Sequence, residues 1–167
     1  MKRAGAVLFV IATLAHAESP ACAADAAERE VRDVIRTVID MRARQDERFV
    51  RFYDAEEYSF PGEAWVFRGQ DRAAERGRAI ESARAAGNKW KMEIRELRVK
   101  AGCDMAWVAG FVHAELLDAE RKTTHTADWR LTAVLERRTA GWRIVHQHSS
   151  LPIHDQRQWW KRVGSPD

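Results

Sequence analysis

The stretch LTAVLERRTAGWRIVHQHSSLP, residues 131–152, decides the fold because it reads as two long strands joined by a tight turn. Apolar and polar residues alternate on both sides of Thr139-Ala140-Gly141, the pattern of strands that bury one face. Residues 123–138 and 142–150 are therefore predicted strands, and residues 105–116 form the strand before them. Successive strands with short connections predict an antiparallel sheet at this end of the chain.

Helical spacing precedes the sheet. Apolar residues recur from Val31 to Ile39 behind a sequence resembling a capping box, Asp25-x-x-Glu28, which predicts an amphipathic helix over residues 26–44. A short helix capped by Asp46 is expected next, and it would carry Phe49, Val50, Phe52 and Tyr53. Short strands at Tyr58–Gly62 and Trp65–Phe67 and a helix over Asp71–Ala86 should follow. Helices that precede a meander of long strands indicate an α+β fold, with the helices on one face of an antiparallel sheet.

A change of phase marks the first long strand. Trp90, Met92 and Ile94 alternate with polar residues, and so do Leu97 and Val99, but the two sets are out of phase. A β-bulge near Arg95-Glu96 would reconcile them, because one extra residue turns the following side chains to the other face.

The chain resembles the SnoaL-like branch of the nuclear transport factor two-like superfamily. The matching pieces are the long first helix, the turn FRGQDRAAE at residues 67–75, and the C-terminal stretch 131–152, which also resembles the association domain of calcium/calmodulin-dependent protein kinase. The resemblance covers about residues 26–152. It implies a cone, in which a curved antiparallel sheet wraps over three N-terminal helices, with a pocket at the open end and frequent dimerisation. Members include isomerases, dehydratases, binding modules and oligomerisation domains, so the fold does not choose among functions.

The N-terminus predicts export. Lys2 and Arg3 precede an apolar run, Ala6–Leu14, and the small-residue site Ala15-His16-Ala17 follows it, which is the order of a secretory signal peptide. We expect residues 1–17 to be removed, or residues 1–23 by alternative cleavage, which leaves a leader at 18–25, a SnoaL-like domain at 26–152 and a tail at 153–167. The location would be periplasmic or extracellular, with no stable membrane anchor.

Charge and cysteine content exclude some classes. Of 28 basic and 25 acidic residues, the signal peptide holds two basic ones, so the mature chain is almost neutral and no nucleic-acid partner is expected. Whether Cys22 and Cys103 pair stays open, because spacing does not determine disulfide geometry. No cofactor and no metal are expected.

Strand parity divides the predicted sheet into two faces. We expect an apolar pocket on the helix-covered face. The residues predicted to bind a ligand there, with Tyr58 as part of the wall, are Tyr58, Val112, Trp129, Ala133, Gln147 and Ser149. Val145 would share this face. The other face carries the residues of an interface or an alternative site: His113, Asp128, Arg130, His146 and His148, beside Trp107, Phe111, Trp142 and Ile144.

Cross-strand partners on the second face follow from the hairpins. His146 would lie opposite Val134, His148 opposite Thr132, and His113 opposite Asp128, which favours a structural role over metal binding. Differences from relatives also bear on the kind of ligand that the pocket could hold. The kinase association domain has arginines where this chain has Val112, Ala133 and Ser149, which weakens the case for a carboxylate-binding pocket.

Two functions remain from the sequence. The first is a binding or oligomerisation module that holds a small hydrophobic molecule in an apolar pocket and forms a homodimer through the aromatic face. The alternative is an isomerase or lyase like ketosteroid isomerase, with a carboxylate base and a tyrosine donor. Tyr53, Tyr58, Glu56 and Glu57 lie near the expected pocket mouth, but no catalytic residue is assigned.

Overall fold

A computed structural model describes residues 24–60 and 67–151 of this protein. The predicted signal peptide, Cys22, most of the leader and the C-terminal tail lie outside the described residues, as do Trp65 and Val66 of a predicted strand. Among the described residues, no helix is both long enough and apolar enough to span a membrane.

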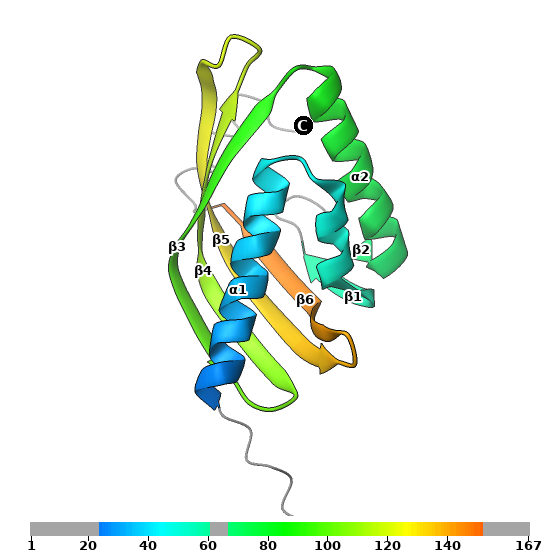
Figure 1. Ribbon diagram of the computed structural model, residues 1–167. Coiled ribbons are helices and arrows are strands. Elements are labelled where there is room, and N and C mark those ends of the chain that lie inside the picture. The colour runs from blue at the N-terminus through cyan, green and yellow to red at the C-terminus, as the bar shows by residue number, and fades with distance from the viewer. Residues whose placement is uncertain (1–23, 61–66, 152–167) are drawn as a thin grey trace, which may run out of the picture.

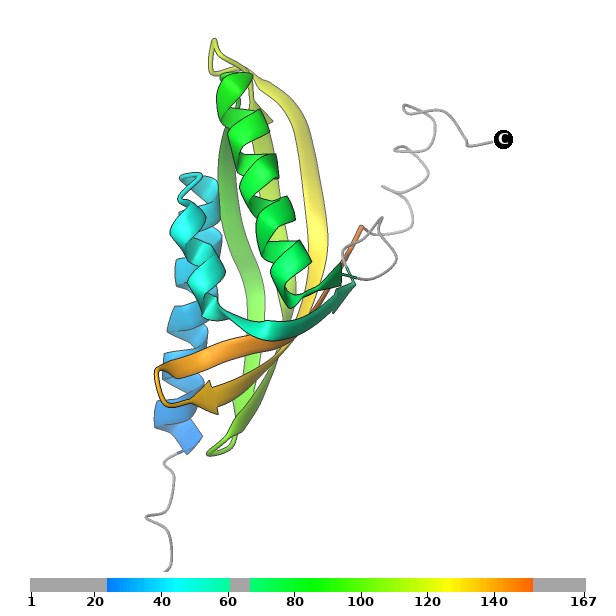
Figure 2. The ribbon, with the colours of Figure 1, turned by 90° about the vertical axis from the view of Figure 1, so that its right-hand side faces the viewer.

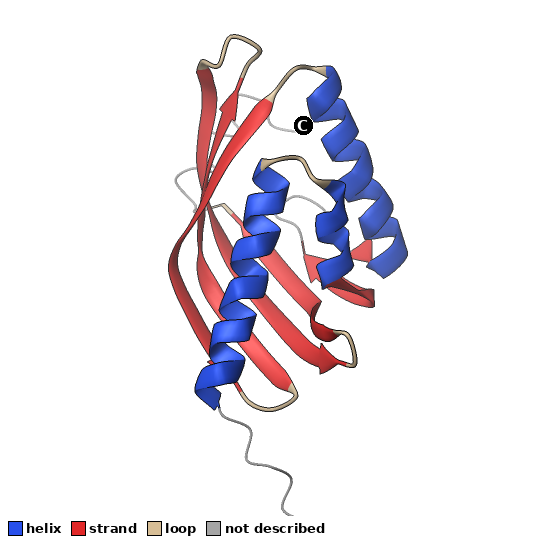
Figure 3. Cartoon of the chain, in the orientation of Figure 1, coloured by secondary structure: helices blue, strands red, loops and turns tan. Residues whose placement is uncertain are grey.

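The structure is an α+β fold in which helices cover one face of a curved six-stranded sheet (Figures 1 and 3). The elements in chain order are α1 (Ala24–Ala43), the 3-10 helix η1 (Glu47–Phe52), β1 (Tyr53–Phe60), β2 (Phe67–Arg68), α2 (Gly69–Ala85), β3 (Lys89–Ala101), β4 (Met105–Leu117), β5 (Thr123–Arg138) and β6 (Gly141–Ser150). The strand order is β2-β1-β6-β5-β4-β3. This confirms the predicted fold class, and Figure 2 shows how strongly the long strands curve.

The helices differ slightly from the prediction. α1 begins at Ala24, so Asp25 lies in the first turn of the helix and not at its N-cap. There its negative charge interacts favourably with the positive end of the helix dipole. The short helix after Asp46 is a 3-10 helix, and the Asp46 side chain accepts a hydrogen bond from the Arg48 backbone N–H. Tyr53, predicted to continue this helix, instead begins β1.

The core lies between α1 and the helix-covered face of the sheet, here called the inner face. Val31, Ile35 and Val38 of α1 are buried against side chains of β3 to β6. Figure 1 shows α1 running across these strands. α2 packs against β1, β2 and η1 instead, so the two helices cover different parts of the inner face.

The predicted bulge in β3 is confirmed. The register with β4 shifts between Arg95 and Arg98, and Glu96 has a positive φ of 49°. The opposing residue is Gly110, where a Cβ atom would lie 3.2 Å from the Arg95 carbonyl oxygen. Arg32 of α1 donates a 2.8 Å hydrogen bond to the Leu97 carbonyl and ties the helix to the bulge. A glycine therefore stands where the bulged backbone approaches most closely.

A second bulge, in β6, places some side chains on the opposite face of the sheet from the one predicted. Val134 pairs with His146 but Leu135 pairs with Ile144, so Val145 has no partner in β5. Trp142 and Ile144 consequently point into the core, where they are 3% and 1% exposed. Their predicted placement on the outer face is wrong, because the prediction assumed an unbroken strand.

Candidate functional site

A strip of polar side chains crosses the inner face where β1 and β6 lie side by side. Glu57 and Ser59 of β1 are 0% and 1% exposed, and Gln147 of β6 is also buried. Ser59 and Gln147 are direct partners in the parallel β1–β6 pairing. We call Tyr53, Glu57, Ser59, Gln147 and Ser149 the inner polar strip. Buried polar groups are costly unless they are hydrogen-bonded, so this strip needs a specific explanation.

Hydrogen bonds order one part of the strip. The Tyr53 hydroxyl donates to Gln147 Oε1 at 2.8 Å, and Gln147 Nε2 donates to Ser149 Oγ at 3.0 Å. Ser59 Oγ is buried and has no hydrogen-bond partner within the described part of the chain. Its hydroxyl group therefore has the capacity both to donate and to accept a hydrogen bond.

Apolar side chains continue the inner face beyond the strip. Gln147 pairs with Ala133 of β5, and farther along β5, beyond Leu131, Trp129 pairs with Val112 of β4 on the same face. Trp129 is only partly buried, as are Trp90, Met92 and Ile94 on the inner face of β3 and Ile80 of α2. An apolar surface that keeps partial exposure thus borders a buried polar strip, the usual composition of a small-molecule site.

The structure brings five of the six predicted ligand-binding residues onto the inner face. These are Val112, Trp129, Ala133, Gln147 and Ser149. Tyr58 does not join them: it is 43% exposed and lies beside His146 on the outer face. Its predicted place in the pocket wall is wrong, since Tyr58 alternates with the inward-facing Glu57 and Ser59.

Glu57 and Ser59 were not among the predicted ligand-binding residues. The expected strand began at Tyr58, so the sequence assigned no direction to Glu57, whereas β1 begins five residues earlier at Tyr53. The pairing of β1 with β6 is parallel and joins residues far apart in the chain. Alternation of Glu57 with Ser59 would have been the available signal, but it also fits a solvent-exposed strand.

The outer face carries the predicted histidines and a group of exposed aromatic rings. Val134 pairs with His146, Thr132 with His148, and His113 with Asp128, as predicted. The large apolar side chains exposed on this face are Tyr58, Phe60, Met105, Trp107 and Phe111. We call them, with His146 and His148, the outer aromatic face. Arg130 shares this side of the sheet and donates to the Leu151 carbonyl oxygen at 2.9 Å.

The outer histidines have local partners. His146 Nδ1 lies 2.7 Å from the Tyr58 carbonyl oxygen, so this nitrogen carries the proton and donates it. The Phe60 ring stands edge-on to both His146 and His148. His113 Nδ1 is 2.9 Å from Asp128 Oδ1. Within residues 24–60 and 67–151, no three His, Cys, Asp or Glu side chains are grouped as a metal site would require.

Below the bulge of β6, a charged cluster ties the sheet to α1. Trp142 Nε1 donates to Glu30 Oε2 at 3.0 Å, and Arg137 pairs with the same oxygen at 2.5 Å. The hydrogen bonds from Trp142 and Arg137 lower the pKa of Glu30 below its usual value. The Arg137 guanidinium also lies 4.7 Å from the centre of the Trp142 ring.

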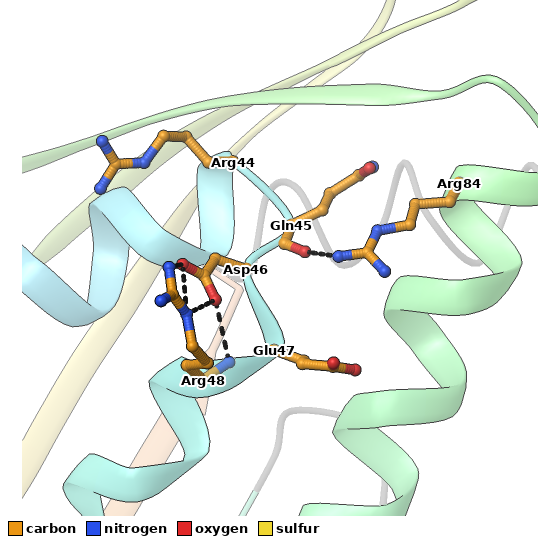
Figure 4. Close-up of a pocket in the computed structure, with 6 residues that line it drawn as sticks. All are labelled: Arg44, Gln45, Asp46, Glu47, Arg48 and Arg84. Atoms are coloured by element: carbon orange, nitrogen blue, oxygen red, sulfur yellow. Dashed lines mark hydrogen bonds and ion pairs between the residues drawn. The ribbon is translucent and has the colours of Figure 1, made fainter.

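A separate depression of about 530 Å³ lies at the surface between α1, η1 and α2 (Figure 4). It is lined by Arg44, Gln45, Asp46, Glu47, Arg48 and Arg84. Hydrogen bonds from Arg48 lower the pKa of Asp46 to about 2, and Arg84 donates to the Gln45 carbonyl oxygen. Asp46 and Arg48 pair with each other, Arg44 pairs with Asp40, and Arg84 binds a backbone carbonyl. Because most of these charges already have partners, the inner polar strip is the better candidate site.

Comparison with known proteins agrees with this architecture. The sequence profile of the SnoaL-like domain matches residues 31–154. No curated protein matches the chain significantly.

Similar solved structures have low sequence identity. An NTF2-like protein of unknown function from Pseudomonas putida has a TM-score of 0.67 and 21% identity, covering 77% of this chain and 88% of that one. A proposed dehydratase of the NTF2-like family from Streptomyces avermitilis has a TM-score of 0.66 and 13% identity, covering 77% and 98%. The association domain of the kinase CaMKII from Caenorhabditis elegans has a TM-score of 0.61 and 22% identity, covering 75% and 96%. At these sequence identities, the structural similarities establish the fold alone.

Proposed function

Since the chain belongs to the SnoaL-like domain family, we propose that it binds a small, largely apolar molecule against the inner face of its sheet. The buried hydroxyl of Ser59, which has no hydrogen-bond partner among the residues that the structure describes, is the observation that carries this proposal. A buried polar group without a protein partner needs another partner, since leaving it unsatisfied costs about 1–3 kcal/mol. A ligand whose polar group reaches Ser59 and whose apolar body meets Trp129 would satisfy both halves of the site.

Adjacent residues of β6 provide a matched test of the binding surface. Ser149 faces inward beside Gln147, whereas His148 faces outward beside Phe60. Ser149→Trp should place a bulky ring over the strip and abolish the binding of naphthol, a compound with an apolar double ring and one hydroxyl. His148→Trp adds similar bulk one residue away and should leave binding unchanged. Isothermal titration on both folded variants measures this, and equal affinities would contradict the proposal.

Glu57 supports a second candidate, an isomerase or lyase. Its carboxyl group is fully buried on the inner face, two residues from Ser59. A carboxylate in such a site can abstract a proton next to a ketone, the first step of an isomerisation. The enzyme should then exchange the acidic protons of tetralone with deuterium oxide, as followed by NMR, and Glu57→Gln should abolish this exchange. If the protein binds tetralone but does not catalyse this exchange, the isomerase or lyase is excluded and the binding function stands.

We further propose that the outer aromatic face joins two copies of the chain. Trp107 and Phe111 are 47% and 37% exposed and lie four residues apart on β4, while Tyr58 and Phe60 lie on β1, beyond β5 and β6. Trp107 and Tyr58 lie in one row across the sheet, with Val134 and His146 between them. Exposed aromatic groups on one face of this kind commonly mark protein interfaces. Trp142, which the sequence placed in this interface, is buried in the core and cannot contribute.

Self-association is tested by a charge on this face. Phe111→Asp should convert a dimer into monomers, because an unpaired carboxylate would be buried at the contact. Thr126→Asp places the same charge on an exposed residue of β5 away from the aromatic rings and serves as the control. Sedimentation velocity at tens of micromolar protein distinguishes the forms. A monomeric wild type would refute the dimer without affecting the proposed binding site.

Export remains a proposal that the N-terminal sequence alone supports. Lys2, Arg3 and Ala15-His16-Ala17 form the pattern of a signal peptide. Intact-mass measurement of the protein from its native host should show a chain that begins after Ala17 or Ala23. Recovery of the full-length chain from the cytosol would contradict export.

A further inference from the structure

The inner polar strip offers hydrogen-bond donors that its own contacts do not use. Gln147 Nε2 has two N–H groups and gives one to Ser149 Oγ. Ser149 accepts that bond and keeps its own hydroxyl proton, and Ser59 has both its proton and its lone pairs available within the described part of the chain. Glu57 is engaged in an interaction of its own. Ser59, Gln147 and Ser149 are therefore the groups that remain to meet a ligand.

These three groups are uncharged. No Lys or Arg side chain among the described residues is hydrogen-bonded to Ser59, Gln147 or Ser149. The inner-facing neighbours in β4 and β5 are Val112, Ala133 and Leu131, which are apolar and buried. A carboxylate transferred to such a surface would lose its hydration without gaining a cation, whereas a neutral oxygen needs only hydrogen bonds.

Sheet geometry sets the size of the ligand. Ser59, Gln147 and Ala133 lie on three successive strands, and Trp129 lies four residues from Ala133 along β5. Strands are spaced by about 4.8 Å and rise about 3.4 Å per residue, so Ser59 and Trp129 are separated by roughly 10–17 Å along the sheet. Side chains that project over the curved inner face shorten this span. A molecule of two or three rings would reach from the polar strip to the tryptophan.

We infer that the site selects a neutral oxygen-bearing ligand, an alcohol or a ketone on a body of two or three rings, over the corresponding carboxylate. Ser59 is the residue that determines this preference, since its hydroxyl is buried and has no partner among the described side chains. The inference rests on the proposed binding function and names the ligand class for the same site.

Three probes with one ring system test the inference: naphthol, naphthoate and naphthalene, titrated into the full mature chain near neutral pH. Naphthol should bind about 3- to 10-fold more tightly than naphthalene, the effect of one or two neutral hydrogen bonds. Naphthoate should bind at least about 10-fold more weakly than naphthol, because the described residues around Ser59, Gln147 and Ser149 offer its charge no cation. Naphthoate binding as tightly as naphthol would overturn the inference while leaving the proposed binding function intact. Failure of all three probes to bind at about 1 mM would instead refute the binding function itself.

Substitutions test whether Ser59 determines the preference for a neutral ligand. Ser59→Ala should reduce the ratio of naphthol to naphthalene affinity to about 1–2, and Ser149→Ala should reduce it in part. Ser150→Ala is the matched control, because Ser150 pairs with Arg130 on the outer side of the sheet. Ser59→Ala should also fold with an unchanged or higher melting temperature, since it removes a hydroxyl that has no described protein partner. A retained preference in folded Ser59→Ala would overturn the assignment.

Discussion

The two halves of β6 follow the same alternation but in opposite phase. In the lower half, Trp142 and Ile144 point into the core. In the upper half, Gln147 points inward while His146 and His148 point outward. The change occurs at Val145, which has no partner in β5. A single unpaired residue therefore gives one strand two chemically different inner faces, an apolar one under α1 and a polar one beside β1.

The difference separates the structural part of the strand from the candidate binding part. The lower half is held by the α1 core and by the bond from Trp142 to Glu30, so it stabilises the fold. The upper half presents Gln147 and Ser149 next to Ser59, where the contacts leave hydrogen-bonding capacity unused. Substitutions in the two halves should thus affect stability and binding separately.

The largest effect is expected from the core side of the bulge. Ile144→Ala should lower the free energy of unfolding by about 2–4 kcal/mol, because it empties a fully packed position. Val145→Ala should cost less than about 1 kcal/mol, since Val145 is only half-buried. Urea unfolding followed by circular dichroism measures both. If Val145→Ala proved the more costly change, the bulge would lie elsewhere.

A smaller effect is expected from His146 in the upper half. His146→Ala removes the hydrogen bond to the Tyr58 carbonyl and should lower stability by about 1 kcal/mol. Naphthol affinity should stay within a factor of two or so of the wild type, because the ring lies outside the inner face, whereas Gln147→Ala should weaken it. Thermal melts combined with titrations separate these outcomes. A stable His146→Ala variant that no longer binds would mean that histidine belongs to the site.

The smallest effect is a pH dependence in the lower half. The bonds from Trp142 and Arg137 hold the pKa of Glu30 below its usual 4.5, so their stabilisation is complete above about pH 4.5 and is lost as the pH falls through the lowered value. Glu30→Gln should cost about 0.5 kcal/mol at neutral pH, a modest amount because the carboxylate is half-exposed. The difference from wild type should shrink near pH 3, as measured by urea unfolding at several pH values. Glu120→Gln, at an exposed loop position, should show no such convergence.

Local patterns in the sequence determined much of this protein. The helical spacing from Val31 to Ile39 and the long alternations after Gly87 predicted the order of elements and the fold class. The mismatch between Ile94 and Leu97 even located the bulge in β3. These features are readable because core burial imposes a period on residues that are close in the chain.

Tertiary structure alone decided which residues share the inner polar strip. β1 joins β6 in parallel across more than eighty residues of chain, and this pairing turns Glu57 and Ser59 inward and Tyr58 outward. The bulge at Val145 likewise directs Trp142 and Ile144 into the core. The residue types around Val145 give no sign of this bulge in the sequence. Alternation along a strand shows that neighbouring side chains lie on opposite faces, but it does not show which face is buried. Only packing against α1 and β1 determines which face is the inner one.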